Sequence, residues 1–231
     1  MNVAILLSGG KGLRLASDVP KQYIEVNGKK IAEYALDTII QSRKFGSVRI
    51  VCEETFREVF EKYKESINID YSYPGVTRQL SILNAMNDIA NDYALLDEIE
   101  NVFIHDAARP LPSIKLIDTL FSAKKMHDGA MPVLPMKDTV YECAQDGHVT
   151  SLLPREKIYA GQAPEIFDFK KYLDACEKLS KEELLSIHGS SEPAIMDGMD
   201  IVTVPGEERN FKITTTEDLK RFIELVGDNS Q

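Results

Sequence analysis

The chain has 231 residues, of which 43% are hydrophobic and 28% charged, a balance typical of a single globular domain. No stretch approaches the roughly 20 apolar residues that cross a bilayer, and the first residues lack the basic start of a signal peptide. Three widely spaced cysteines show no metal-binding spacing and indicate a reducing compartment, so we expect a cytoplasmic protein. The net charge of −10 argues against sequence-independent binding of nucleic acid.

Short apolar segments typical of buried strands alternate with segments whose apolar residues recur at helical spacing. Strands are predicted at residues 3–7, 48–52, 69–73, 102–105 and 130–134. Helices are predicted at residues 31–41, 55–63, 79–91 and 113–126. This alternation predicts an α/β fold with a doubly wound, mostly parallel, Rossmann-like sheet, in which ligands bind beyond the carboxyl ends of the strands.

The pattern changes between residues 137 and 163. Two strand-like segments, 139–142 and 148–152, flank the turn-prone pair Asp146-Gly147 and predict a protruding β-hairpin arm. An exposed hairpin often packs against a partner subunit. We therefore expect the arm, residues 137–163, to be the dimerisation element of a single domain spanning residues 1–231.

The last part of the chain returns to the α/β pattern. A strand is predicted at residues 201–204 and a helix at 216–226, with Thr216 as its N-cap. Lys212 lies in the basic turn between them, and on its own would be read as a surface lysine.

A basic, glycine-rich loop follows the first predicted strand. Its glycines let backbone N–H groups approach phosphate oxygens, and its lysines and arginine supply positive charge. The loop consists of Leu7, Ser8, Gly9, Gly10, Lys11, Gly12, Leu13 and Arg14, and is followed by Pro20, Lys21 and Gln22. The pattern predicts a triphosphate site of the nucleotidyltransferase type.

Two other nucleotide-binding loops fit less well. A dinucleotide-binding loop needs a third glycine where Leu15 stands, and a P-loop needs Gly-Lys-Ser/Thr after four spacer residues. An NAD-binding oxidoreductase stays open as a distant alternative, because Glu53 and Glu54 follow the second predicted strand, where such enzymes place an acidic residue.

The loop and the Pro-Lys-Gln-Tyr that follows resemble the first segment of the 2-C-methyl-D-erythritol 4-phosphate cytidylyltransferase family, which includes the similar ribitol-5-phosphate cytidylyltransferases. The resemblance extends over essentially the whole chain. Further matching segments, in the family's order, are residues 75–81, 105–110 (His-Asp-Ala-Ala-Arg-Pro), 135–139, 153–155 and 210–214.

The resemblance implies the nucleotidyltransferase fold, with CTP as one substrate and Mg²⁺ or another divalent cation as cofactor. The nucleotide would be bound by the glycine-rich loop together with Gly75, Arg78, Ser81 and Asp106. Asp106 is also the candidate metal ligand. Without the resemblance, a structural Asp106–Arg109 pair that caps the next helix is the less favoured alternative.

The resemblance also implies that the second substrate is a polyol phosphate, bound by Asp106, Arg109, Thr139, Arg155 and Lys212. Arg155 would reach this acceptor from the arm of the other subunit of a homodimer, although alone it reads as a solvated charge. The residues implied in catalysis are Arg14, Lys21, Arg155 and Lys212.

Two departures from the family pattern lie on the acceptor side. Ala163 replaces the threonine of a Gln-Thr-Pro element, and residues 190–194 (Ser-Ser-Glu-Pro-Ala) replace a Thr-Asp-Asp/Glu-Ala stretch. The His-Asp-Ala-Ala-Arg-Pro segment favours 2-C-methyl-D-erythritol 4-phosphate as the acceptor. An insertion at residues 178–183 favours ribitol-5-phosphate or another polyol phosphate of capsule or teichoic-acid synthesis. A third possibility is a protein that binds CTP without catalysis.

Overall fold

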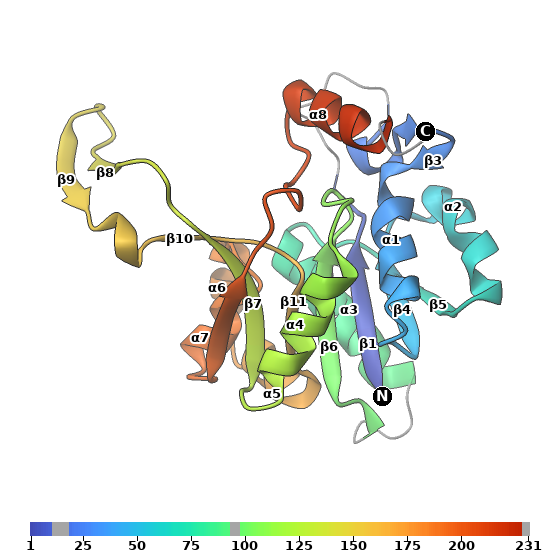
Figure 1. Ribbon diagram of the computed structural model, residues 1–231. Helices are drawn as coiled ribbons and strands as arrows, with labels where there is room; N and C mark the ends of the chain where they lie inside the picture. The colour runs from blue at the N-terminus through green and yellow to red at the C-terminus, as the bar shows by residue number, and fades with distance from the viewer. Residues whose placement is uncertain (11–18, 93–97, 228–231) are drawn as a thin grey trace.

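A computed structural model describes residues 1–10, 19–92 and 98–227 of the chain. Its centre is a sheet of eight strands in the order β10-β7-β11-β6-β1-β4-β5, with β12 paired to β7 (Figure 1). The strands are β1 (Asn2–Leu7), β4 (Ser47–Val51), β5 (Asn68–Ser72), β6 (Asn101–Asp106), β7 (Gly129–Pro135), β10 (Tyr159–Gly161), β11 (Glu165–Asp168) and β12 (Ile201–Pro205). The six strands predicted for this sheet all occur, within two residues at each end.

The sheet is parallel on one side and mixed on the other. Strand β1 pairs in parallel with β4 and β6, and β4 pairs in parallel with β5. The short strand β11 lies between β6 and β7 and is antiparallel to both, and β10 is antiparallel to β7. These two antiparallel strands were not predicted.

Helices cover both faces of the sheet, which makes two hydrophobic cores. Alternate residues of β1 serve different cores, because successive side chains of a strand point to opposite faces. Leu6 packs in one core with α1 (Ile31–Gln41) and α4 (Ile114–Lys124). Ile5 packs in the other with α3 (Arg78–Asp92) and α5 (Phe169–Glu177). These contacts confirm a doubly wound arrangement.

The segment predicted as one helix at residues 55–63 is divided into three short turns. They are the 3-10 helix η2 (Glu54–Phe56), the helix α2 (Glu58–Glu61) and the 3-10 helix η3 (Lys62–Glu65). Phe56 stacks on Tyr23 with ring centroids 3.9 Å apart, and Phe60 is fully buried. Tertiary packing of these rings therefore overrides the helical spacing.

The N-cap of the C-terminal helix α8 (Thr216–Gly227) lies one residue before the predicted position. The Asp218 amide donates to the Thr215 hydroxyl at 3.1 Å, and the Asp218 carboxylate accepts from the Thr215 amide at 2.8 Å. This reciprocal pair makes Thr215 the N-cap, so the assignment of Thr216 was wrong. Three successive threonines offered the same hydroxyl, and the position of Asp218 decides between them.

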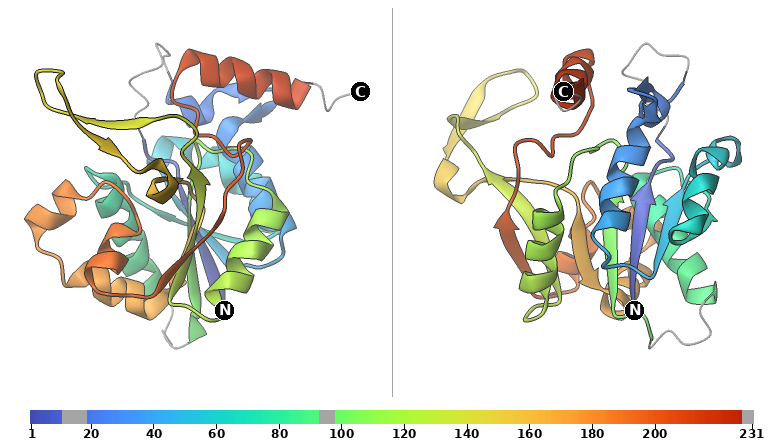
Figure 2. Two further views of the ribbon diagram at one scale, coloured as in Figure 1. Left: turned by 60° about the vertical axis from the view of Figure 1, so that its left-hand side comes forward. Right: turned by 45° about the vertical axis from the view of Figure 1, so that its right-hand side comes forward.

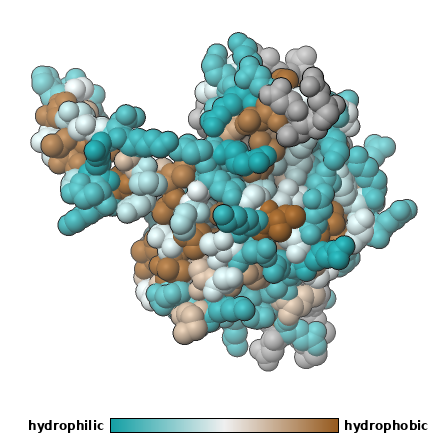
Figure 3. Space-filling view, in the orientation of Figure 1, coloured by the Kyte–Doolittle hydropathy of each residue, from teal (hydrophilic) through white to brown (hydrophobic). Residues whose placement is uncertain are grey.

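The predicted hairpin forms β8 (Val140–Cys143) and β9 (Val149–Leu153), an antiparallel pair that stands away from the body of the molecule (Figures 1 and 2). The 3-10 helix η5 (Arg155–Lys157) follows, and the chain then joins the main sheet as β10. The last residues of the predicted arm therefore belong to the sheet. Apolar side chains gather on the arm (Figure 3), where Tyr141, Val149 and Leu152 are 56%, 62% and 65% exposed.

The remaining elements are short. They are η1 (Lys21–Tyr23), β2 (Glu25–Val26), β3 (Lys29–Lys30), α6 (Lys181–Ser186) and α7 (Glu192–Met196). In the part of the chain that the structure describes, no helix combines the length and the apolar character required to cross a membrane.

Candidate active site

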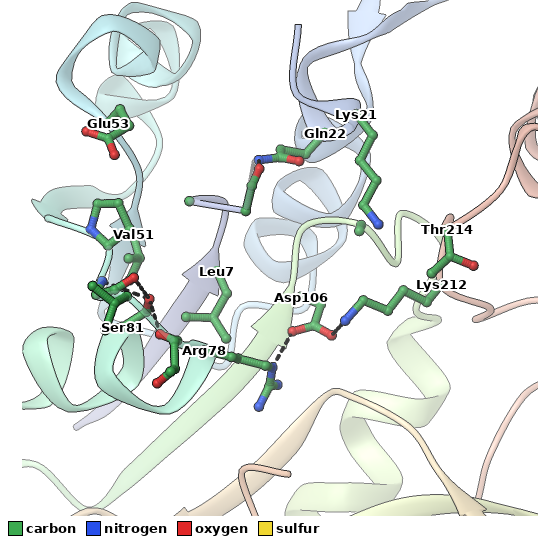
Figure 4. Close-up of a pocket in the computed structure, with 17 residues that line it drawn as sticks. Leu7, Lys21, Gln22, Val51, Glu53, Arg78, Ser81, Asp106, Lys212 and Thr214 are labelled. Carbon is green, nitrogen blue, oxygen red and sulfur yellow. Dashed lines mark hydrogen bonds and ion pairs between the residues drawn. The ribbon is translucent and has the colours of Figure 1, made fainter. Parts of the chain in front are cut away.

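A cavity of about 770 Å³ opens beyond the carboxyl ends of β1, β4 and β6 (Figure 4). Residues from six separate stretches of the chain, within 7–10, 21–22, 51–53, 74–81, 106–108 and 212–214, line it together, as the parallel strands predict. Nine of the predicted site residues that the structure describes are among them: Leu7, Gly9, Gly10, Lys21, Gly75, Arg78, Ser81, Asp106 and Lys212. Lys11, Gly12 and Arg14 lie outside the described residues.

The glycine-rich loop and the loop after β5 approach each other closely. A Cβ atom added at Gly9 would lie 2.4 Å from the Cβ of Pro74, and one at Gly75 would lie 2.6 Å from the Cβ of Leu80. A side chain at Gly9 would force the two loops apart, and one at Gly75 would clash with the start of α3. Gly9 and Gly75 therefore bring backbone groups of both loops to the wall of the cavity.

Ser81 holds the turn that leads into α3. Its hydroxyl accepts from the Gly75 amide at 2.9 Å and donates to the Thr77 carbonyl at 2.8 Å. The hydroxyl is thus engaged with its own loop. The side chain of Ser81 therefore orders this wall of the cavity through contacts with its own segment.

Asp106 contacts two positively charged side chains at the cavity, Arg78 and Lys212. Its Oδ1 accepts from Arg78 Nε at 2.9 Å, and its Oδ2 accepts from Lys212 Nζ at 2.8 Å (Figure 4). Burial alone would raise the pKa of this carboxyl, but the charges of Arg78 and Lys212 outweigh it, so the pKa lies well below its usual range. Asp106 is therefore ionised at every physiological pH, and the cluster carries a net positive charge.

Lys212 reaches this cluster because its backbone is tied to the loop after β6. The Ile213 amide donates to the Ala108 carbonyl at 2.8 Å, and the Asn210 side chain donates to the Ala163 carbonyl at 2.7 Å. The two hydrogen bonds flank Lys212 in sequence. They fix the position of the Lys212 backbone, from which the side chain extends toward Asp106.

Arg109 takes part in the same framework. Its Nη1 donates to the Asn210 carbonyl at 2.8 Å, and its own carbonyl lies 2.8 Å from His105 Nε2. Burial lowers the pKa of His105 to about 4, so this imidazole is neutral. Arg109 is not among the described residues that line the cavity. Its observed contacts support the segment that carries Lys212.

Thr139 and Arg155 are on the arm, and both are exposed. Arg155 Nη1 donates to the Lys137 carbonyl at 2.8 Å, a contact within the arm itself. Of the described residues, neither of these two lines the cavity of its own chain. The structure therefore separates two of the predicted acceptor residues from the rest.

Sequence reasoning missed several residues at the cavity. Gln22, Glu53 and Thr214 line it, and each stands next to a residue or in a segment that was singled out for another reason. Glu165 is not among the described lining residues, but it lies behind the Asp106 cluster, is 5% exposed, and burial raises the pKa of its carboxyl to about 7. No signal in the sequence could have found Glu165, because its place depends on the unpredicted strand β11.

Both departures from the family pattern are buried structural positions. Ala163 is 5% exposed and Ser190 is 1% exposed. The Ser190 carbonyl accepts from the Tyr172 hydroxyl at 2.7 Å, and Ser191 is the N-cap of α7. Among the residues that the structure describes, Ala163 and Ser190 are not in the cavity lining.

We tested whether the described side chains fit a bound metal ion. In residues 1–10, 19–92 and 98–227, no three His, Cys, Asp or Glu side chains are placed to hold one ion. Both oxygens of Asp106 already accept hydrogen bonds from positive side chains, which would repel a divalent cation. The observed arrangement thus disfavours Asp106 as a metal ligand.

Comparisons with known proteins agree with this geometry. A 2-C-methyl-D-erythritol 4-phosphate cytidylyltransferase from Clostridium beijerinckii is 32% identical over 221 residues, 94% of each chain. A ribitol-5-phosphate cytidylyltransferase from Lactiplantibacillus plantarum is 29% identical over 235 residues and matches over the full length of both. The crystal structure of a 4-diphosphocytidyl-2C-methyl-D-erythritol synthase from Anaerococcus prevotii superposes with a TM-score of 0.81 at 27% identity, over 98% of this chain and 96% of that one.

The sequence model of the 2-C-methyl-D-erythritol 4-phosphate cytidylyltransferases matches residues 2–225. This match covers every element from β1 to most of α8. The chain therefore belongs to the 2-C-methyl-D-erythritol 4-phosphate cytidylyltransferase family of nucleotidyltransferases.

Proposed function

We propose that this protein transfers the cytidylyl group of CTP to a polyol phosphate, and that the acceptor is 2-C-methyl-D-erythritol 4-phosphate. The observation that carries the proposal is the Asp106 cluster. Arg78 and Lys212 are brought within hydrogen-bonding distance of one carboxylate, at the end of β6 and beside the start of the glycine-rich loop, in a cavity large enough for a nucleotide. Members of the same family provide the names of both substrates.

In the proposed reaction, an oxygen of the acceptor phosphate attacks the α-phosphorus of CTP. A new oxygen–phosphorus bond forms as the bond to the β-phosphate oxygen breaks, and pyrophosphate leaves with that electron pair. The acceptor phosphate is already ionised near neutral pH, so no general base is required. The protein's task is to position two anions and stabilise developing negative charge.

Lys21, from η1, and Lys212, from the segment before α8, both line the cavity and would serve this task (Figure 4). Lys21 would stabilise the charge on the α-phosphate and the leaving pyrophosphate, together with Arg14. Lys212 would hold the acceptor phosphate near Asp106. Arg78 would stay with Asp106 and keep this carboxylate from repelling the incoming anions.

In the proposed reaction, Mg²⁺ would be bound mainly by the nucleotide rather than by the protein. Mg²⁺ prefers phosphate oxygens and water, and binds few protein groups in such sites. It would supply charge neutralisation on the triphosphate. The Asp106 cluster gives no reason to route any step through a metal bound to the protein.

We also propose a homodimer in which each arm completes the other subunit's cavity. Arg155 and Thr139 are exposed on the arm and away from their own cavity, and the arm presents apolar side chains that a partner would cover. Arg155 would then bind the acceptor phosphate of the partner. The proposed location of the dimer is the cytoplasm, in keeping with the cysteines Cys52, Cys143 and Cys176, which are free thiols.

The acceptor is best identified by a panel of phosphorylated polyols. The purified protein would be given CTP, Mg²⁺ and one acceptor at a time, with pyrophosphate release as the readout. We expect the highest kcat/KM with 2-C-methyl-D-erythritol 4-phosphate. Preference for ribitol-5-phosphate, the substrate named for one relative, would select that alternative instead.

Thermal unfolding in the presence of CTP or NAD separates the remaining alternatives. A ligand that binds only the native state raises the midpoint of unfolding. We expect CTP to raise it and NAD to leave it unchanged. CTP binding without pyrophosphate release, with every acceptor of the panel, would indicate a non-catalytic binder.

A further inference from the structure

We propose that Gln22 is a positioning residue, whose side-chain amide fixes the glycine-rich loop in the form that receives the triphosphate. This inference rests on the proposed function, because it concerns the nucleotide side of the same cavity. Gln22 follows Lys21 in η1, and its side chain is directed at the loop after β1 (Figure 4).

The contacts of Gln22 are short and well buried. Its Nε2 donates to the Ser8 carbonyl at 2.7 Å and to the Gly10 carbonyl at 2.7 Å, and the residue is 3% exposed. A side-chain amide nitrogen has two protons, so both are used. Two carbonyl oxygens can be satisfied only by the nitrogen end of the amide, which fixes its orientation.

Tyr23 adds a second anchor at the same place. Its hydroxyl accepts from the Ser8 hydroxyl at 2.8 Å and donates to the Ser8 carbonyl at 3.0 Å. Burial raises the pKa of this phenol far above its usual value, so it keeps the proton that it donates. Three hydrogen bonds therefore hold the carbonyls of Ser8 and Gly10.

The local sequence explains why one segment can do this. Pro20 precedes η1 and fixes the backbone at φ −57°, and a 3-10 helix has three residues per turn. Successive side chains therefore leave η1 in different directions. Lys21 lines the cavity while Gln22 and Tyr23 reach the loop.

The effect of the contacts follows from peptide electrostatics. A glycine-rich loop has many backbone conformations, and in some of them carbonyl oxygens would face the phosphates and repel them. Gln22 holds two of these oxygens to itself. Because the C=O and N–H of a trans peptide point in opposite directions, the Gly9 amide then points away from Gln22. Residues 8–10 are thus held in one conformation before the nucleotide arrives, which reduces the entropy lost on binding.

Gln22→Met tests the proposal, because methionine has similar length and no amide. The matched control is Gln162→Met. Gln162 is also buried, and its Nε2 donates to the Glu207 carbonyl at 3.0 Å, but it lies on the acceptor side. We expect Gln22→Met to raise the Kd of CTP roughly tenfold or more, the fold-change that corresponds to losing one to two net hydrogen bonds. Gln162→Met should leave this Kd near the wild-type value.

The decisive readout is the comparison of CTP with cytidine for each variant, by calorimetric titration. A positioning role toward the phosphates predicts that Gln22→Met weakens CTP and leaves cytidine unchanged. Equal weakening of both, or an unchanged Kd of CTP, would overturn the proposal. If Gln22→Met does not fold, Tyr23→Phe removes one of the three hydrogen bonds and should show the same selective loss at smaller size, and its absence there would equally overturn the proposal.

The wild-type measurements keep this test separate from that of the proposed function. Wild-type protein that fails to bind CTP contradicts the proposed function itself. Wild-type protein that binds CTP, together with Gln22 variants that bind it equally well, contradicts only the positioning role.

Discussion

On the proposed nucleotide side of the cavity, short stretches of sequence build the wall: the loop after β1 contacts both the loop after β5 and η1 directly. On the proposed acceptor side, Lys212 is held by residues from the loop after β6, from the turn before β11 and from its own loop, up to about half the chain apart. Arg155 and Thr139, predicted for this second side, lie on the arm and are not among the described residues that line the cavity. Local motifs thus form the first side, and long-range packing forms the second.

The largest effect is expected at Asp106, where the two sides meet. Asp106→Asn leaves Arg78 and Lys212 without the carboxylate that they share, so their side chains lose their positions. We expect pyrophosphate release to fall by about 10²–10³-fold. Asp37→Asn, which removes a carboxylate paired with Lys29 and absent from the described cavity lining, is the matched control and should retain activity. Activity within a few-fold of wild type in Asp106→Asn would show that the cluster is not the centre of the site.

The next prediction concerns the arm. Lys21→Ala and Arg155→Ala are each expected to lose pyrophosphate release by about 10²-fold, one on the nucleotide side and one through the partner. Refolded together in equal amounts, they would form mixed dimers with one intact cavity, because body and arm then come from different chains. About a quarter of wild-type activity should return in a random mixture. No recovery would place Arg155 in the cavity of its own chain or outside catalysis, and Lys157→Ala serves as the arm control.

A smaller effect should separate the two sides in steady-state kinetics. Asn210→Ala removes the hydrogen bond to the Ala163 carbonyl and loosens the backbone that carries Lys212. The KM of the acceptor should rise about tenfold, while the KM of CTP stays constant. Arg209→Ala, at the exposed neighbouring position, should change neither. Equal increases of both KM values would mean that the two sides are not independent.

The smallest effect is a pH dependence of stability from Glu165. Its carboxyl faces the charges of Asp106, Arg78 and Arg109 and a hydrogen bond from Ser191, and burial raises its pKa to about 7. The folded state therefore holds this proton more tightly than the unfolded state, and the stabilisation is lost as the pH rises from about 4.5 to above 7.

Glu165→Gln removes this titrating carboxyl group, and with it its contribution to the pH dependence of stability. The unfolding midpoint of the variant, relative to wild type, should increase between pH 5 and pH 8. The contribution of His105 is the same in both proteins and cancels in the difference. A difference that does not change with pH would contradict the raised pKa.

The parallel half of the fold could be predicted because each unit carries its own signal. Strand β1 is an apolar run that ends at glycines, and α1 has the predicted bounds Ile31–Gln41. The mixed half could not, since β11 has only four residues, directly follows Pro164, and is defined by pairing with strands distant in sequence. The buried position of Glu165 could not be predicted either, because a glutamate is normally expected on the surface.

For the site, the motifs located Asp106, Arg78 and Lys212 in one place, although nothing in the sequence indicated that they contact one another. Arg109 shows the limit of the approach. Its position in the motif suggested a ligand contact, whereas the structure gives it the Asn210 carbonyl as partner. A motif reports that a residue is near a site and not which atoms it touches.

The way the arm is attached to the body determines where a force on the arm would be transmitted. Lys137, at the start of the arm, forms an ion pair with Glu208, in the segment that leads to Lys212, and β10 at the end of the arm is paired to β7. In the proposed dimer, force applied to an arm by the partner would reach the strands and the loop that hold the acceptor side, while the loop after β1 stays isolated from it. Dilution that separates the subunits should therefore lower the affinity for the acceptor before it lowers the affinity for the nucleotide.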